Sequence, residues 1–182
     1  MSTTAKLLTA EEFWKIADHR QMELECGEVI IMNQPGLRHG YVCTRVISVV
    51  DQFVEAHRLG RVFSNDAGVV TERGPDTVRG PDVMYYSFAR LPADVLPEGY
   101  GNLPPEVAFE VLSPDDRPRR VIRKIAEYLT VGVLCVVVLD PESRTISLHR
   151  KDQLTTELSI RDELRLPEIS DAFAVPVARL FS

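Results

Sequence analysis

The chain has 182 residues, of which 45% are hydrophobic and 26% are charged. This size and composition fit one globular domain and exclude a disordered or fibrous protein. A formal net charge of −6 at pH 7 argues against nonspecific coating of nucleic acid, because such binding depends on neutralising phosphates with basic side chains. The longest apolar run, Val131 to Leu139, is interrupted by Gly132 and is too short to cross a bilayer. We therefore expect one domain over residues 1–182, in the cytoplasm and not in a membrane.

The N-terminal part of the chain predicts a short helix and a β-hairpin. Thr9 is followed three residues later by Glu12, which is the pattern of a capping box at the start of a helix. Two runs with strand-like alternation, Met22 to Cys26 and Glu28 to Met32, are separated by a single glycine. Such an arrangement is typical of a hairpin.

The longest predicted helix comes next. Valines recur at helical spacing from Val42 to Val54, and Gly60 ends the segment. The pattern then changes to that of strands. We expect strands at Arg61 to Ser64, Ala67 to Glu72, Val78 to Tyr86 and Glu106 to Leu112. A loop rich in proline and glycine separates the last two.

A second long helix is predicted from the region of Pro118 to Val131, with apolar residues on one face. The continuous apolar run Leu134 to Leu139 is typical of a central strand covered on both faces. Two further runs, Arg144 to His149 and Leu154 to Ile160, predict a hairpin. A short extended segment with a turn completes the chain.

These elements predict an α/β (α+β) fold with a mixed central β-sheet flanked by helices and additional hairpins at both ends. We divide the single domain into three segments. They are an N-terminal helix and hairpin (residues 1–36), a core (37–141) and a C-terminal β extension (142–182).

The cysteines indicate a reducing environment. Cys26, Cys43 and Cys135 lie far apart, and no CxxC pair is present. This pattern excludes a disulfide framework and a zinc knuckle. We interpret the three thiols as small buried side chains of an intracellular protein.

Two carboxylates are distinguished by their position. Glu110 lies within Val-Ala-Phe-Glu-Val-Leu, so it should be partly buried and needs a partner, either a cation of an ion pair or a metal. Asp82 follows Pro81 within the strand predicted at Val78 to Tyr86, and an ordinary strand-end acid is the alternative there. Acids on adjacent strands repel unless a cation lies between them or one is protonated. Ligation by oxygen alone favours Mg²⁺ or Mn²⁺, which can activate water against a phosphodiester.

A basic run follows the strand that carries Glu110. Lys124 lies four residues before Tyr128, so it borders the apolar face of the predicted helix and can point back over the sheet. A cation there would stabilise charge that develops on a phosphate. The same run contains four arginines that we consider candidates for nucleic-acid binding, namely Arg117, Arg119, Arg120 and Arg123. A solvated basic helix face is the alternative interpretation of these arginines.

Taken in order, these residues resemble the Uma-two family of restriction-endonuclease-like proteins, part of the PD-(D/E)XK nuclease-like superfamily. The resemblance covers about residues 10–180. It rests on Pro81-Asp82, Glu110-Val-Leu-Ser-Pro114, Lys124 with Tyr128, Gly132-Val133 and Asp140-Pro141, and on Glu23-Leu-Glu-Cys-Gly-Glu28 with Met32 and His39.

The resemblance implies a restriction-endonuclease-like core and a set of site residues. Asp82 and Glu110 would be ligands of Mg²⁺ or Mn²⁺, with Lys124 as the third catalytic residue. Glu23 and His39 would lie near the site in supporting roles.

Three positions differ from the expected patterns. The superfamily usually has its lysine two residues after the glutamate, where this chain has Leu112. The family places the lysine on the following helix, where this chain has Lys124. The family usually has an acid four residues before that lysine, and here the residue is Arg120. The family also has an aromatic residue in the buried strand, where this chain has Val136-Val137.

Two hypotheses for the function follow. The first is a Mg²⁺-dependent endonuclease that acts on nucleic acid, with DNA as the expected partner. The second is a catalytically inactive module for binding or assembly that keeps the nuclease fold, as the displaced lysine, Arg120 and the acidic net charge would allow. We also expect a homodimer, because a double-strand cutter needs two sites and hairpin edges can pair.

Overall fold

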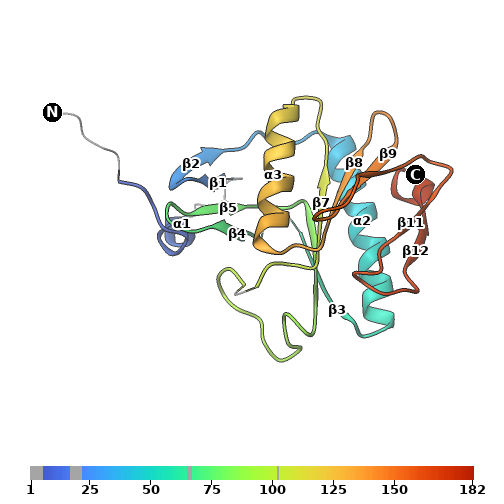
Figure 1. Ribbon diagram of the computed structural model, residues 1–182, viewed down its shortest axis with the longest axis horizontal. Helices are drawn as coiled ribbons and strands as arrows, with labels where there is room; N and C mark the ends of the chain where they lie inside the picture. Colours follow the sequence, from blue (N-terminus) through green and yellow to red (C-terminus); the bar gives the residue numbers. More distant parts are fainter. Residues whose placement is uncertain (1–5, 17–21, 65–66, 102) are drawn as a thin grey trace.

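A six-stranded mixed sheet forms the centre of the molecule in the computed structural model, which describes residues 6–16, 22–64, 67–101 and 103–182 (Figure 1). Its strand order is β10-β9-β8-β7-β6-β3, with β7 and β8 parallel and the other neighbours antiparallel. The strands are β3 (Gly60–Ser64), β6 (Val83–Ser87), β7 (Val107–Val111), β8 (Cys135–Asp140), β9 (Thr145–His149) and β10 (Thr156–Leu158). The predicted mixed sheet flanked by helices is confirmed.

In the described parts of the chain, two smaller sheets and three α-helices accompany the central sheet. The four-stranded sheet has the order β2-β1-β5-β4 and the two-stranded sheet pairs β11 with β12. These strands are β1 (Met22–Glu25), β2 (Glu28–Ile31), β4 (Val69–Glu72), β5 (Thr77–Arg79), β11 (Glu163–Arg165) and β12 (Ala174–Pro176). The helices are α1 (Ala10–Ile16), α2 (Leu37–Ala56), α3 (Pro118–Val131) and the 3₁₀ helix η1 (Val177–Leu180).

The central sheet is covered on both faces. Helix α2 and the C-terminal segment pack on one face, in the same cluster as Phe109 and Val111 of β7. Helix α3 packs on the other face, in the same cluster as Ala108. Because side chains alternate along a strand, Glu110 lies on the α3 side together with Ala108. In Figure 1, α3 stands between the central sheet and the four-stranded sheet, and it contacts both β8 and β4.

The predicted start of the chain agrees with the structure. The hydroxyl of Thr9 accepts a hydrogen bond from the Glu12 backbone N–H (3.1 Å), and the Glu12 carboxylate accepts one from the Thr9 N–H (3.0 Å). The capping box therefore begins α1 as expected. Strands β1 and β2 form the predicted hairpin. No described helix combines the length and apolar character needed to span a membrane.

The prediction of a single strand from Val78 to Tyr86 is wrong. The chain leaves β5 of the four-stranded sheet after Arg79 and enters β6 of the central sheet at Val83. Pro81 in this connection lacks an N–H group and cannot continue a strand ladder, so the chain changes sheets here. Asp82 consequently lies in the connection between two sheets, directly before β6.

Two predicted boundaries also change. Helix α2 ends at Ala56, and Gly60 is the first residue of β3 instead of the end of the helix. The C-terminal segment, expected to be a short extended stretch with a turn, contains the β11–β12 hairpin followed by η1. Leu164, Phe173 and Leu180 of this segment are buried against the α2 face of the central sheet. Burial in the core therefore gives this segment more regular structure than its pattern indicates.

The glycine that ends α3 gives a first test of the fold. Gly132 has φ +108°, a left-handed conformation that a side chain disfavours. We expect Gly132→Ala to lower the free energy of unfolding by about 1–2 kcal/mol. Gly40→Ala, inside α2 where an added Cβ meets no neighbour, should raise it by about 0.5–1 kcal/mol. Urea denaturation measures both changes, and a loss of similar size in both variants would contradict this account.

Candidate active site

The register of two neighbouring strands brings Asp82 and Glu110 together. Val83 of β6 pairs with Phe109 of β7, so the next position along places Asp82 opposite Glu110. The Oδ2 atom of Asp82 accepts a hydrogen bond from the backbone N–H of Val111 at 2.7 Å. This bond holds the carboxylate beside the end of β7. The two acids predicted as metal ligands are therefore neighbours.

Glu110 is a carboxylate inside the protein, 9% exposed. Its Oε1 atom accepts a hydrogen bond from the Tyr128 hydroxyl at 2.8 Å, and its Oε2 atom lies 3.4 Å from Nζ of Lys124. Burial raises the pKa of Glu110 to about 7, because Lys124 opposes the effect only in part and the negative charge of Asp82 adds to it. A further positive charge near these acids would therefore stabilise the ionised form of Glu110.

Lys124 points from α3 back toward the sheet, as its position on the helix predicts. Its Nζ atom lies 2.8 Å from Oε1 of Glu23 and 3.4 Å from Oε2 of Glu110. Burial alone would lower the pKa of Lys124, but the negative charges of Glu110 and Glu23 outweigh it and raise the pKa above its ordinary value. The side chain is thus a charged ammonium group held between two acids.

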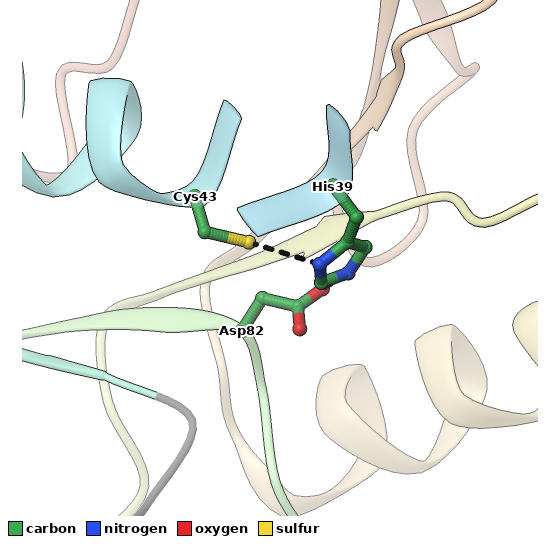
Figure 2. Close-up of side chains that lie close together, drawn as sticks. All are labelled: His39, Cys43 and Asp82. Carbon is green, nitrogen blue, oxygen red and sulfur yellow. Dashed lines mark hydrogen bonds and ion pairs between the residues drawn. The ribbon is translucent and has the colours of Figure 1, made fainter. Parts of the chain in front are cut away.

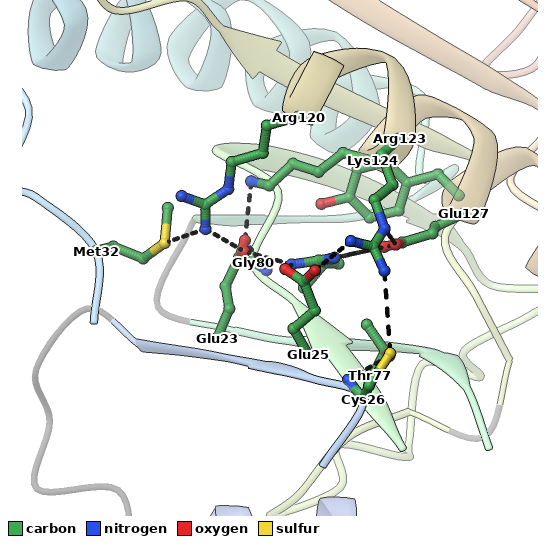
Figure 3. A network of polar contacts seen from close by, with 12 residues as sticks. Glu23, Glu25, Cys26, Met32, Thr77, Gly80, Arg120, Arg123, Lys124 and Glu127 are labelled. Carbon is green, nitrogen blue, oxygen red and sulfur yellow. Dashed lines mark hydrogen bonds and ion pairs between the residues drawn. The ribbon is translucent and has the colours of Figure 1, made fainter. Parts of the chain in front are cut away.

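Glu23 connects this site to a larger network of charges (Figure 3). Its Oε2 atom lies 3.0 Å from Nη1 of Arg79 and 3.3 Å from Nη2 of Arg120. Burial would raise the pKa of Glu23, but Lys124 and Arg79 lower it below its ordinary value. Glu23 therefore remains a carboxylate that can orient Lys124.

Arg79 is the centre of this network and was not singled out from the sequence. Its side chain is 1% exposed and also binds Glu25 (3.1 Å) and Glu127 (2.6 Å). These partners come from two elements, β1 and α3, whereas Arg79 itself belongs to β5. The available signal was an arginine within a short strand next to the apolar Val78, which suggests a buried charge that needs partners.

The four arginines proposed for nucleic-acid binding divide into two pairs. Arg120 binds Glu23 and the sulfur of Met32, and Arg123 pairs with Glu25 and Glu127 (Figure 3). Arg117 and Arg119 are exposed, and no described residue forms an ion pair with them. Arg117 and Arg119 are therefore the two arginines that remain available to an external anion.

His39 contacts Asp82 from the other side of the site (Figure 2). Its Nε2 atom lies 3.2 Å from Oδ2 of Asp82, and its Nδ1 atom lies 3.5 Å from Sγ of Cys43. Burial would lower the pKa of His39, but the hydrogen bond to Asp82 raises it above its ordinary value. The expected proximity of His39 to the site is thus present in the structure.

Cys43 is a member of this site that sequence reasoning missed. The signal was its spacing of four residues from His39 within a helix, which puts both side chains on one face. Thiol, imidazole and carboxylate follow one another here in the order found in cysteine hydrolases. However, burial and the charge of Asp82 raise the pKa of Cys43 well above its ordinary value, so the thiol is neutral and a poor nucleophile.

The acid pair has the chemistry of a site for a hard divalent cation. The two carboxylates come from opposing positions of neighbouring strands, and in the described part of the chain nothing donates a hydrogen bond to Oδ1 of Asp82. Mg²⁺ and Mn²⁺ prefer oxygen ligands of this kind and often use one or two carboxylates with water. Burial raises the pKa of Glu110, and the negative charge of Asp82 adds to the effect; a cation beside the two acids would oppose both contributions. Asp82 and Glu110 therefore fit the expected ion.

Comparison with known proteins identifies the family. The model of the Uma2 family, described as "Putative restriction endonuclease", matches residues 10–178. The chain belongs to the Uma2 family. The resemblance noted in the sequence is thereby confirmed. A comparison with curated proteins found no match.

A solved structure has the same fold as this Uma2 chain. It is the crystal structure of a protein described as a putative nuclease belonging to DUF820 from Anabaena variabilis ATCC 29413. The TM-score is 0.79, the sequence identity is 22%, and the match covers 96% of this chain and 97% of that chain. At this identity the likeness shows the fold, which agrees with the predicted nuclease-like core.

The charge network gives a second test, on stability. Arg79→Met should lower the free energy of unfolding by about 3–5 kcal/mol, because Glu23 and its neighbouring acids would lose a buried partner. Arg123→Met is the matched control, since this guanidinium is 53% exposed and its loss should cost less than about 1 kcal/mol. Chemical denaturation compares the two variants. Equal losses would show that Arg79 is not the centre of the network.

Proposed function

We propose that the protein is a Mg²⁺-dependent endonuclease that hydrolyses phosphodiester bonds in DNA. One observation carries the proposal, namely that Lys124 of α3 lies beside Glu110 of β7, while Asp82, directly before β6, lies opposite Glu110 in the strand register. Two neighbouring acids, with a charged amine beside one of them, are the groups that metal-assisted phosphodiester hydrolysis requires. The description of the Uma2 family supports the same reaction class.

Asp82 and Glu110 would hold Mg²⁺ or Mn²⁺. When bound, the ion would supply Lewis-acid chemistry by lowering the pKa of water and by neutralising charge on the phosphate. Tyr128 fixes the orientation of Glu110 through its hydroxyl, and the backbone N–H of Val111 fixes Asp82. His39 supports Asp82 from the side of α2.

Lys124 would stabilise the negative charge that develops on the phosphate in the transition state. An ammonium group has three N–H donors, and Glu23 and Glu110 are two acceptors within reach. The third donor is available to a phosphate oxygen. Glu23 would act as a positioning residue, because it holds Lys124 and is itself held by Arg79.

A second candidate function is a catalytically inactive module for binding or assembly. One observation favours it: Lys124 already lies 3.4 Å from Glu110 and so balances part of the negative charge without a metal. In such a module the ion pair would be structural. Titration with Mn²⁺ distinguishes the two candidates, because only the nuclease needs the acid pair to bind a divalent ion.

Three variants separate metal binding from catalysis. Asp82→Asn and Glu110→Gln should each abolish Mn²⁺ binding measured by calorimetry, because a ligand is lost. They should also reduce Mg²⁺-dependent cleavage of plasmid DNA by at least about 10²-fold. Lys124→Met should reduce cleavage by about 10²-fold yet keep Mn²⁺ binding, because it removes a cation that competes for Glu110.

Glu163→Gln serves as the control for these variants, because its carboxylate is exposed on β11 and should affect neither measurement. Circular dichroism establishes that each variant is folded. Undiminished cleavage by Glu110→Gln would refute the nuclease proposal. DNA binding without any response to Mn²⁺ would favour the inactive module instead.

The exposed arginines at the start of α3 allow a test of DNA binding. Arg117→Gln and Arg119→Gln should each weaken binding and reduce the slope of log K against log salt by about 1, as expected for loss of one phosphate contact. Arg123→Gln should have a smaller effect, because its guanidinium is paired with Glu25 and Glu127. Fluorescence anisotropy with labelled duplex DNA, without divalent metal, measures all three. Equal slopes in every variant would exclude this surface as the DNA contact.

The proposal includes a homodimer in the cytoplasm. Two copies would supply two sites for cutting both strands of a duplex, and β2 and β10, which are edge strands among the described residues, could pair between copies. The mass of the particle in solution, measured by light scattering, decides the assembly state. Cleavage of matched RNA and DNA duplexes decides between the two nucleic acids.

A further inference from the structure

Three side chains of different chemistry meet beside the proposed nuclease site. His39, Cys43 and Asp82 each offer one ligand atom, and these atoms all lie within 4.8 Å of one another (Figure 2). His39 and Cys43 come from successive turns of α2, which fixes them on one helix face. The Val111 N–H holds Asp82 in place from the sheet. The group is therefore assembled by two rigid elements.

The three ligand atoms lie close to the spacing of a tetrahedral zinc site. With bonds of about 2.0–2.3 Å, ligand atoms around Zn²⁺ lie roughly 3.3–3.6 Å apart. In the structure, Sγ of Cys43 lies 3.5 Å from one ring nitrogen of His39, and Oδ2 of Asp82 lies 3.2 Å from the other. These two short distances involve different ring nitrogens, and all three ligand atoms lie within 4.8 Å of one another. To share one ion through a single ring nitrogen, the atoms need to approach one another by up to about 1.5 Å.

The donor set also distinguishes this group from the acid pair. Nitrogen and sulfur ligands select Zn²⁺, whereas Mg²⁺ and Mn²⁺ prefer oxygen. A thiolate and a carboxylate together balance the charge of a divalent ion. Three protein ligands leave a fourth position for water or substrate, as in open zinc sites.

We propose that His39, Cys43 and Asp82 form a Zn²⁺ site that shares Asp82 with the acid pair. The binding of zinc stands on these three residues alone. Because Asp82 serves both sites, Zn²⁺ and Mg²⁺ compete for it, and zinc inhibits cleavage. This consequence rests on the proposed nuclease function.

Cys26 provides a matched control. It is half-buried like Cys43, but its sulfur lies 3.9 Å from the guanidinium of Arg123, and a cation beside the sulfur disfavours a metal ion there. Cys135 is buried in the core of the central sheet. Among the residues that the structure describes, the only group of three or more His, Cys, Asp or Glu side chains with metal-site spacing is the one that contains Cys43.

Cobalt and zinc titrations of the full-length protein test the site directly. One equivalent of Co²⁺ should give a thiolate-to-cobalt charge-transfer band in the near ultraviolet, and Zn²⁺ should abolish it. Cys43→Ser should lose the band and weaken Zn²⁺ binding by at least about tenfold. Cys26→Ser should keep both properties.

The outcomes separate this proposal from the nuclease function. The absence of the cobalt band in the wild-type protein, or unchanged Zn²⁺ affinity in Cys43→Ser, would overturn the zinc site even if Mg²⁺-dependent cleavage is observed. Conversely, a cobalt band that depends on Cys43 in a protein that never cleaves DNA supports the zinc site and refutes the nuclease. Zn²⁺ should inhibit cleavage less in Cys43→Ser than in the wild type, each relative to its own zinc-free rate.

Discussion

A carboxylate in the middle of a buried strand determines the arrangement of this molecule. Glu110 lies on β7 against α3, where an unpaired charge is costly. Tyr128 and Lys124 of α3 supply a hydrogen bond and a positive charge. Lys124 is itself buried and takes Glu23 as a second acid, and Glu23 in turn binds Arg79. Each buried charge therefore requires an oppositely charged partner, which is itself buried and requires another. The chain of ion pairs from Glu110 to Arg79 ends only at side chains that are partly exposed.

This series of charges joins the two larger sheets. Glu110 belongs to the central sheet, while Glu23 and Arg79 belong to the four-stranded sheet that contains the N-terminal hairpin. Helix α3 lies between them and carries Lys124. A hairpin that the sequence places outside the core thus contributes the acid that orients Lys124. The low dielectric of the interior strengthens these pairs but makes the loss of any one partner costly.

Local patterns predicted the parts of the site that depend on strand and helix periodicity. An acid surrounded by apolar neighbours indicated the buried position of Glu110, and helical spacing indicated that Lys124 turns toward the sheet. The change of sheet around Pro81 depends on which distant strands pair with each other. The alternation of apolar and polar residues along a strand does not contain this information. Arg79 was missed because its partners Glu23, Glu25 and Glu127 are distant in the sequence. Cys43 was missed because its neighbour His39 gains significance only through its contact with Asp82, which is also distant in the sequence.

Asp82 lies between two sets of possible metal ligands that prefer different ions. On one side lies Glu110, a hard oxygen ligand, and on the other lie the nitrogen of His39 and the sulfur of Cys43. A hard ion gains from Glu110 and has little affinity for a thiol, whereas a thiophilic ion gains from Cys43. If both proposed sites bind metal, the ion that occupies Asp82 depends on which neighbour contributes more free energy, while the Val111 backbone holds Asp82 in either case.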